Sequence, residues 1–190
     1  MKLKIRKRRG DAHITQGTPK VPHFKTIVAD PPWMERGGGK IRRGADKHYP
    51  LLTTPQIIQT MATSGYWRPH PDGCHMYLWV TNNFLKDGIF VMEALGFRYI
   101  TNRVWVKDRF GIGYYFRGQH EIVLFGTSLS GKAIPPKVKN MPSIFYADRT
   151  KHSQKPSQFY NDVELISQGP YLEMFARCPR EGWTTWGNEV

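Results

Sequence analysis

The run Asp30-Pro31-Pro32-Trp33 combines residue types that together could bind and activate an amine. Residues 26–30 before the prolines predict a short buried strand, because all but Asp30 are β-branched or apolar. Two prolines end that strand, since neither has an N–H to donate and both hold φ near one value. The pattern therefore predicts a carboxylate, free carbonyl groups and an indole at the carboxyl end of a strand, where open α/β sheets bind ligands.

A carboxylate and a fixed carbonyl can accept two hydrogen bonds from one –NH2 group, and a nearby indole can stack on the ring that carries it. An exocyclic amine of a nucleobase fits this description. Two acceptors on its hydrogens favour a pyramidal, nucleophilic nitrogen. A turn that merely ends a strand, followed by a core tryptophan, is the alternative reading of the same four residues.

The same run resembles the catalytic signature of the MT-A-type adenine-N6 methyltransferases. The resemblance spans roughly residues 25–190 and continues in order through these segments: Leu78-Trp79-Val80-Thr81-Asn82, Trp105-Val106-Lys107, His120-Glu121, Lys155-Pro156, Glu173-Met174-Phe175-Ala176-Arg177, Gly182-Trp183 and Gly187-Asn188-Glu189. An ordered series of this length is far more specific than a four-residue match.

The resemblance implies S-adenosylmethionine as cofactor and methyl transfer to the N6 amine of adenine. It implies catalytic roles for Asp30, Pro31, Pro32 and Trp33, with the Asp30 carboxylate and the Pro31 carbonyl accepting from the amine and Trp33 stacking on the base. It assigns cofactor contacts to Asp30, Lys155, Glu173, Arg177, Asn188 and Glu189.

Three of these cofactor residues also stand out by position. Lys155 lies at a predicted helix start, where a lysine gains nothing from the helix dipole, and the resemblance pairs it with the cofactor carboxylate. Arg177 and Asn188 follow predicted strand ends, where ribose hydroxyls are commonly bound. Glu173 alternates with apolar residues, so it either orients Lys155 or Arg177 from inside or is a paired structural carboxylate.

Two loops are expected to lie beside the target base: residues 34–50, which contain Tyr49, and residues 107–118. In residues 107–118 basic and aromatic side chains interleave, as base stacking beside a charged backbone requires. The substrate contacts predicted there and elsewhere are Trp33, Tyr49, Lys107, Arg109, Tyr114 and Arg117, of which Tyr49 comes from the resemblance. A partly buried connection is the alternative for residues 107–118. His120 is expected to be a core histidine rather than a base.

The alternation of elements predicts an α/β class with a mostly parallel sheet. The resemblance specifies the Rossmann-like methyltransferase fold, in a permuted order with the catalytic strand before the cofactor strands. Strands are expected at 26–30, 75–81, 99–106, 119–125, 143–146, 171–176 and 183–186, and helices at 54–63, 84–95 and 155–166. Residues 1–22 are expected to be a basic arm and linker, and residues 23–190 the methyltransferase domain.

Composition narrows the partners. The formal net charge of +13 favours a polyanion, and the arm carries six lysines and arginines within its first nine residues. DNA is the expected substrate because no RNA-binding module is appended, with RNA as the alternative. Two other functions are less favoured. The intact Asp30–Trp33 run argues against a catalytically inactive nucleic-acid-binding partner, and the basic charge argues against a protein-glutamine methylase.

The sequence predicts neither a metal site nor a membrane span, since no apolar run reaches about 18 residues. The two cysteines, Cys74 and Cys178, lack zinc-ligand spacing and suit the reducing cytoplasm of a bacterial or phage-infected cell. A protein partner or a homodimer is left open.

Overall fold

The computed structural model describes residues 21–34, 51–111, 115–149, 154–188 and 190. Its strands are β1 (Thr26–Ala29), β2 (His75–Val80), β3 (Phe97–Val106), β4 (His120–Ser128), β5 (Ile144–Tyr146), β6 (Tyr171–Met174) and β7 (Trp183–Trp186). Its helices are α1 (Thr54–Thr63), α2 (Leu85–Ala94) and α3 (Ser157–Ile166), with a 3-10 turn, η2 (Asn82–Phe84), before α2.

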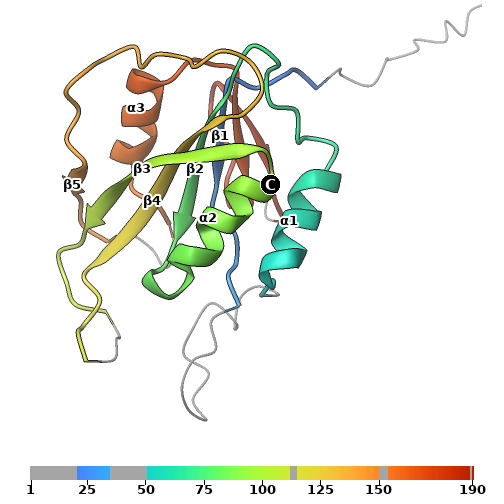
Figure 1. Ribbon diagram of the computed structural model, residues 1–190. Helices are drawn as coiled ribbons and strands as arrows, with labels where there is room; N and C mark the ends of the chain where they lie inside the picture. The colour runs from blue at the N-terminus through green and yellow to red at the C-terminus, as the bar shows by residue number, and fades with distance from the viewer. Residues whose placement is uncertain (1–20, 35–50, 112–114, 150–153, 189) are drawn as a thin grey trace, which may run out of the picture.

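The strands form one sheet in the order β5-β3-β4-β2-β1-β6-β7 (Figure 1). β1 lies inside the sheet and pairs in parallel with β2 and β6, and β6 pairs in parallel with β7. Within the described residues only β4 runs against its neighbours, because it pairs antiparallel with both β2 and β3. The predicted α/β class with a mostly parallel sheet is confirmed, and the carboxyl ends of β1, β2, β6 and β7 share one edge.

Side-chain alternation along the strands builds two cores, one on each face of the sheet. Ile27 and Ala29 of β1 pack with the buried residues of α1 and α2. Val28 points the other way and packs with Phe159 and Val163 of α3. The result is a three-layer arrangement in which the backbone of β1 is enclosed, so the residue that follows it is held by a rigid scaffold.

The element boundaries differ slightly from the prediction. Helix α1 keeps its predicted bounds and is capped by Thr53, whose N–H donates to Gln56 Oε1 at 2.9 Å in a capping box. Helix α2 begins at Leu85, one residue after its predicted start, because Asn82–Phe84 form the 3-10 turn η2. β4 extends three residues beyond its predicted end, to Ser128, because it pairs along its whole length with β3.

Among the described residues the buried histidine is His75, whereas His120 is exposed, so the expectation of a core position for His120 is wrong. His75 Nε2 lies 2.9 Å from the Ile134 carbonyl oxygen and must donate to it, which leaves Nδ1 to accept from the Ser167 hydroxyl at 2.8 Å. Burial lowers the pKa of His75, although the bond to Ile134 opposes the shift. His120 is exposed because it starts β4 at the rim of the sheet.

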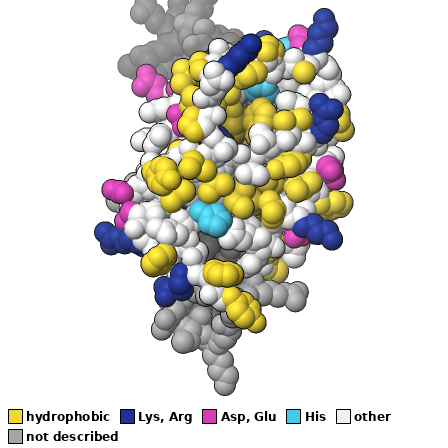
Figure 2. Space-filling view, turned by 60° about the vertical axis from the view of Figure 1, so that its left-hand side comes forward, with side chains coloured by type: hydrophobic (Ala, Val, Ile, Leu, Met, Phe, Trp, Pro, Cys, Tyr) yellow, Lys and Arg dark blue, Asp and Glu magenta, His cyan; other side chains and the backbone are white. Residues whose placement is uncertain are grey.

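The edge strand β5 carries apolar side chains that remain partly open: Ile144 is 43% and Tyr146 68% exposed. Figure 2 shows apolar side chains gathered across the face that contains this edge, with Lys and Arg side chains around its margin. Among the described residues, no helix has the length and hydrophobicity needed to cross a bilayer.

Candidate active site

The Asp-Pro-Pro elbow joins the end of β1 to the segment before α1. The Asp30 N–H donates to the Met174 carbonyl at 3.3 Å, and the Leu52 N–H donates to the Pro32 carbonyl at 2.8 Å. The Pro31 carbonyl, expected to be free, accepts from the Trp33 N–H at 2.9 Å. Each carbonyl keeps a second lone pair, so the elbow remains an acceptor surface, but its carbonyls are not unoccupied as the sequence suggested.

Trp33 has a different environment from the expected one. Its ring is 6% exposed and stacks on Phe84, with ring centroids 5.3 Å apart and planes at 22°. Its Nε1–H donates to the Trp79 carbonyl at 2.9 Å. The alternative of a core tryptophan therefore describes this environment better than stacking on the target base: the ring packs in the core and braces the elbow against β2.

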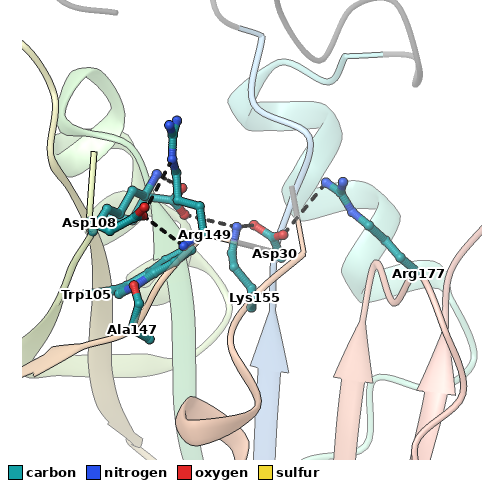
Figure 3. Close-up of polar contacts among 9 residues, drawn as sticks. Asp30, Trp105, Asp108, Ala147, Arg149, Lys155 and Arg177 are labelled. Atoms are coloured by element: carbon teal, nitrogen blue, oxygen red, sulfur yellow. Dashed lines mark hydrogen bonds and ion pairs between the residues drawn. The ribbon is translucent and has the colours of Figure 1, made fainter. Parts of the chain in front are cut away.

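Asp30 lies at the mouth of β1 between two cations (Figure 3). Its Oδ1 is 2.9 Å from Lys155 Nζ, and its Oδ2 is 3.8 Å from a terminal nitrogen of Arg177. Lys155 comes from the segment before α3 and Arg177 from the loop after β6, so three separate parts of the chain meet at this carboxylate. The sequence named all three residues, but not that both cations would lie against Asp30.

Lys155 also bridges to a residue that the sequence analysis did not assign. Lys155 Nζ is 3.1 Å from Glu121 Oε2, and Glu121 Oε1 is 2.5 Å from Lys107 Nζ. Lys155 Nζ further lies 4.8 Å from the centre of the Trp79 ring. Charges of alternating sign thus run from Lys107 through Glu121 and Lys155 to Asp30.

This row is mostly enclosed, which strengthens its interactions. The side chains of Lys155 and Glu121 are 10% and 22% exposed. Burial lowers the pKa of Lys155, but the carboxylates of Asp30 and Glu121 outweigh it, so that pKa lies above its ordinary value. Burial raises the pKa of Glu121, but Lys155 and Lys107 outweigh it and hold that pKa at about 2. Lys155 and Glu121 are therefore both charged at neutral pH.

Glu121 could have been suspected from its neighbours in the hairpin of β3 and β4. It pairs across the antiparallel ladder with Trp105, two residues before Lys107. A carboxylate at that place lies within reach of a lysine just beyond the partner strand. Lys107, predicted to contact the substrate, instead donates to Glu121.

Glu173 faces α3 rather than the cations beside Asp30. The Tyr160 hydroxyl donates to Glu173 Oε1 at 2.6 Å, and Arg180 Nε lies 4.0 Å from Oε2. Burial raises the pKa of Glu173, although the bond from Tyr160 and the charge of Arg180 oppose this. The alternative of a paired structural carboxylate describes this geometry better than the expected orientation of Lys155 or Arg177.

A cleft of about 160 Å³ opens beside Asp30 between the ends of β1, β6 and β7. Its walls are Asp30, Pro32, Leu52, Thr60, Phe175, Ala176, Arg177, Trp186, Gly187 and Asn188. The loop after β6 has an unusual backbone, because Phe175 has a positive φ of 61°, a conformation that residues other than glycine rarely adopt. Such conformations concentrate at ligand sites.

Gly187 allows the two loops of this cleft to approach each other. A Cβ atom at Gly187 would lie 2.2 Å from the Ala176 carbonyl oxygen and 2.7 Å from its nitrogen. The Ala176 N–H also donates to the Trp186 carbonyl at 3.0 Å. The backbones after β6 and β7 are therefore locked together, and this places Arg177 and Asn188 on one cleft wall.

The remaining predicted substrate residues lie at the rim or outside the description. Arg109 is 77% exposed and contacts Asp108, and Arg117 Nε donates to the Gly111 carbonyl at 2.6 Å. Near them the exposed aromatic side chains are Phe110, Tyr115 and Phe116. Tyr49, Tyr114 and Glu189 lie outside the described residues.

Comparison with known proteins identifies the relatives of this arrangement. The family model described as MT-A70 matches residues 24–189. The chain is 28% identical over 196 residues to the "Type II methyltransferase M.MunI" of Mycoplasma sp, covering 90% of this chain and 81% of that protein. It is 27% identical to human "N(6)-adenine-specific methyltransferase METTL4", covering 88% of this chain and 37% of that protein.

A third relative is the "N6-methyladenosine RNA methyltransferase MTA1" of Cryphonectria parasitica, 27% identical over 89% of this chain and 52% of that protein. The chain thus spans about half of MTA1 and just over a third of METTL4. The matched region contains Asp30, Glu121, Lys155, Arg177 and Asn188 together. The chain therefore belongs to the MT-A70 family of adenine-N6 methyltransferases.

Proposed function

We propose that this protein transfers a methyl group from S-adenosylmethionine to the N6 amine of adenine in DNA. The observation that carries this proposal is the position of Asp30. Its carboxylate lies at the mouth of β1, 2.9 Å from the Lys155 ammonium, and it lines the cleft between β6 and β7. A cofactor in that cleft and a base approaching from the rim would meet at this residue.

The cleft residues fit the cofactor by the chemistry of their donors. Arg177 offers a charged donor, and the Asn188 side chain offers both a donor and an acceptor for ribose hydroxyl groups. A lysine ammonium has three hydrogens, and Lys155 directs two of them at Asp30 and Glu121, so one remains for the cofactor carboxylate. Glu189 completes the proposed set, whereas Glu173 is left out because its carboxylate is bonded to Tyr160. When bound, S-adenosylmethionine supplies an electrophilic methyl group.

The chain's own part in the reaction is to hold and orient the amine. An oxygen of Asp30 accepts one N–H of the adenine amine, and the second lone pair of the Pro31 carbonyl accepts the other. This directs the nitrogen lone pair toward the cleft, and positioning of this kind can lower a barrier by several kcal/mol. Asp30 can then hold the proton that the methylated amine loses until solvent takes it. For duplex DNA the adenine must first leave the stack, at a cost of a few kcal/mol.

The rim residues are proposed to hold the flipped nucleotide. Arg109 and Arg117 supply positive charge, and Tyr114 and Tyr49 are proposed to contact the base. Further surfaces for stacking on the base are the exposed rings of Phe110, Tyr115 and Phe116. Trp33 is left out of base stacking because its ring is enclosed.

DNA is preferred over RNA because the match covers 81% of M.MunI but smaller parts of the longer relatives, including the RNA methyltransferase MTA1. RNA methylation is the second candidate, supported by that same relative. An inactive binding partner is disfavoured because Asp30 retains its cationic neighbours beside a formed cleft.

The decisive experiment is transfer of labelled methyl groups to matched DNA and RNA, followed by nucleoside analysis. We expect N6-methyldeoxyadenosine in DNA and little label in RNA. Label that appears only in RNA would move the substrate to the second candidate. Binding of both ligands without any transfer would make the protein a partner rather than an enzyme.

Replacement of Gly187 by alanine should close the cofactor cleft. The new Cβ would clash with the Ala176 backbone, which cannot move without breaking its bond to Trp186. Overpacking of this kind costs about 1–3 kcal/mol, so calorimetry should show S-adenosylmethionine binding weakened by roughly tenfold or more. DNA affinity measured without cofactor is the internal control and should change little. Unchanged cofactor affinity would place the cofactor elsewhere.

A further inference from the structure

A second charged cluster lies at the same end of the sheet, and of its residues the proposed function uses only Arg109. Asp108 follows β3, and Arg149 follows β5. Asp108 Oδ2 accepts from Arg109 Nε at 2.9 Å, and Arg149 Nε lies 3.9 Å from Oδ1 of the same carboxylate. One carboxylate thus gathers two guanidinium groups from two different loops.

The backbone of this cluster is fixed rather than loosely attached. The Arg149 N–H donates to Asp108 Oδ1 at 3.0 Å, and this bond is the main cause of a lowered pKa for Asp108. The Trp105 indole donates to the Ala147 carbonyl at 2.7 Å, and the Ala147 N–H donates to the Val106 carbonyl at 3.3 Å. Arg149 is therefore held at the end of β3, not on an independent loop.

Both guanidinium groups approach Asp108 with Nε, at 2.9 Å in Arg109 and 3.9 Å in Arg149, so these ion pairs do not use their terminal nitrogens. The side chains are 77% exposed in Arg109 and 41% in Arg149. Figure 3 shows Asp108 and Arg149 on one side of Lys155 and Asp30, with Arg177 on the other side, at the carboxyl ends of the strands. The two terminal nitrogens of a guanidinium group match two oxygens of a phosphate.

We propose that Arg109 and Arg149, oriented by Asp108, form a binding site for one phosphodiester group of the nucleic acid beside the target adenosine. This proposal rests on the proposed function, because it requires a base at Asp30. The cluster keeps one net positive charge after Asp108 is counted, and it belongs to a chain of net charge +13. Asp108 is a positioning residue here, since it orients the donors without contacting the phosphate.

The position of the cluster explains why a phosphate would bind there. Lys107 adjoins Asp108 in sequence, and from Lys107 the ion pairs lead through Glu121 and Lys155 to Asp30. When the base of a nucleotide reaches Asp30, the phosphates of that nucleotide must lie outside the ion-pair row, on the side where Asp108 adjoins Lys107. Phosphate contacts fix the register of a nucleic acid without reading its sequence, so they would align the flipped nucleotide.

The test uses duplex DNA that contains the adenine which the protein has been mapped to methylate. In each duplex, one phosphate near that adenine is replaced by a neutral methylphosphonate. For the wild-type protein, one methylphosphonate position should weaken binding by roughly tenfold. Arg149→Gln and Arg109→Gln should lose affinity on unmodified DNA and lose their sensitivity at that same position. Each contact removed should also lower the salt slope by about 0.9.

Arg98→Gln is the matched control, because Arg98 is an exposed arginine at the opposite end of β3. It should keep the position-dependent loss. If Arg98→Gln and Arg149→Gln give the same profile, the arginines contribute only general charge and the site is refuted. If the wild-type protein methylates no adenine in either nucleic acid, the proposed function itself has failed.

Asp108→Asn separates positioning from charge. If Asp108 only neutralises its neighbours, removing its charge should tighten DNA binding and leave the methylphosphonate profile unchanged, which would contradict the proposal. If it orients them, the sensitivity should spread over several phosphates. A parallel series on an RNA of the same sequence distinguishes the two sources of the phosphodiester.

Discussion

Asp30→Asn is expected to lose nearly all methyl transfer while the protein stays folded. The amide presents one oxygen instead of two and carries no charge, so it cannot accept from the adenine amine and also face Lys155 and Arg177 as the carboxylate does. Loss of a single preorganised contact to the reacting group costs about 10²–10³-fold in kcat. Single-turnover transfer to DNA at saturating cofactor measures this directly.

Asp72→Asn is the control for that experiment. Asp72 is an exposed aspartate in the loop before β2, at the other end of the sheet from Asp30. It should keep wild-type turnover. Near-normal transfer by Asp30→Asn would remove the carboxylate from the mechanism, and with it the central observation behind the proposed function.

Lys155→Met should produce the largest combined loss of stability and activity. Methionine has a similar length but no charge, so Asp30 and Glu121 would face each other without the cation between them. Removing one partner of a buried ion pair costs about 3–5 kcal/mol, which denaturant unfolding will measure. Transfer should fall as well, because Asp30 loses its closest anchor.

Two variants separate the roles of Lys155. Lys107→Met removes the other cation beside Glu121 but leaves the pair of Lys155 and Asp30, so transfer should fall much less. Lys155→Met combined with Glu121→Gln removes the repulsion and should recover part of the stability without recovering transfer. Equal transfer by Lys107→Met and Lys155→Met would show that only the summed charge of the row matters.

Acid unfolding gives an independent measure of the row. The native pKa of Glu121, about 2, lies below its ordinary value of 4.5, so its ion pairs stabilise the fold above pH 4.5. That contribution is lost as the pH falls from 4.5 toward 2. In Lys155→Met the native pKa of Glu121 should rise toward its ordinary value, and the loss of stability in this window should become shallower.

The sequence determined the elements and the identity of the central carboxylate. Alternating and apolar runs predicted every strand in the sheet within a few residues, because side-chain period is a local property. The prolines after Asp30 marked the strand end for the same reason. The ordered motifs from Asp30 to Asn188 added the family, which the comparison confirmed.

Only the tertiary structure decided how these residues are paired. Trp33 was expected to face the substrate, but its ring is enclosed by Phe84 and bound to the carbonyl of Trp79, both distant in sequence. Glu121 and Arg149 were not assigned, because their partners Lys155 and Asp108 are 34 and 41 residues away. Local patterns report which face a residue occupies, whereas ion pairs depend on which strands become neighbours. In this protein the order of the strands in the sheet brings Asp30, Lys155 and Arg177 from three segments to one edge.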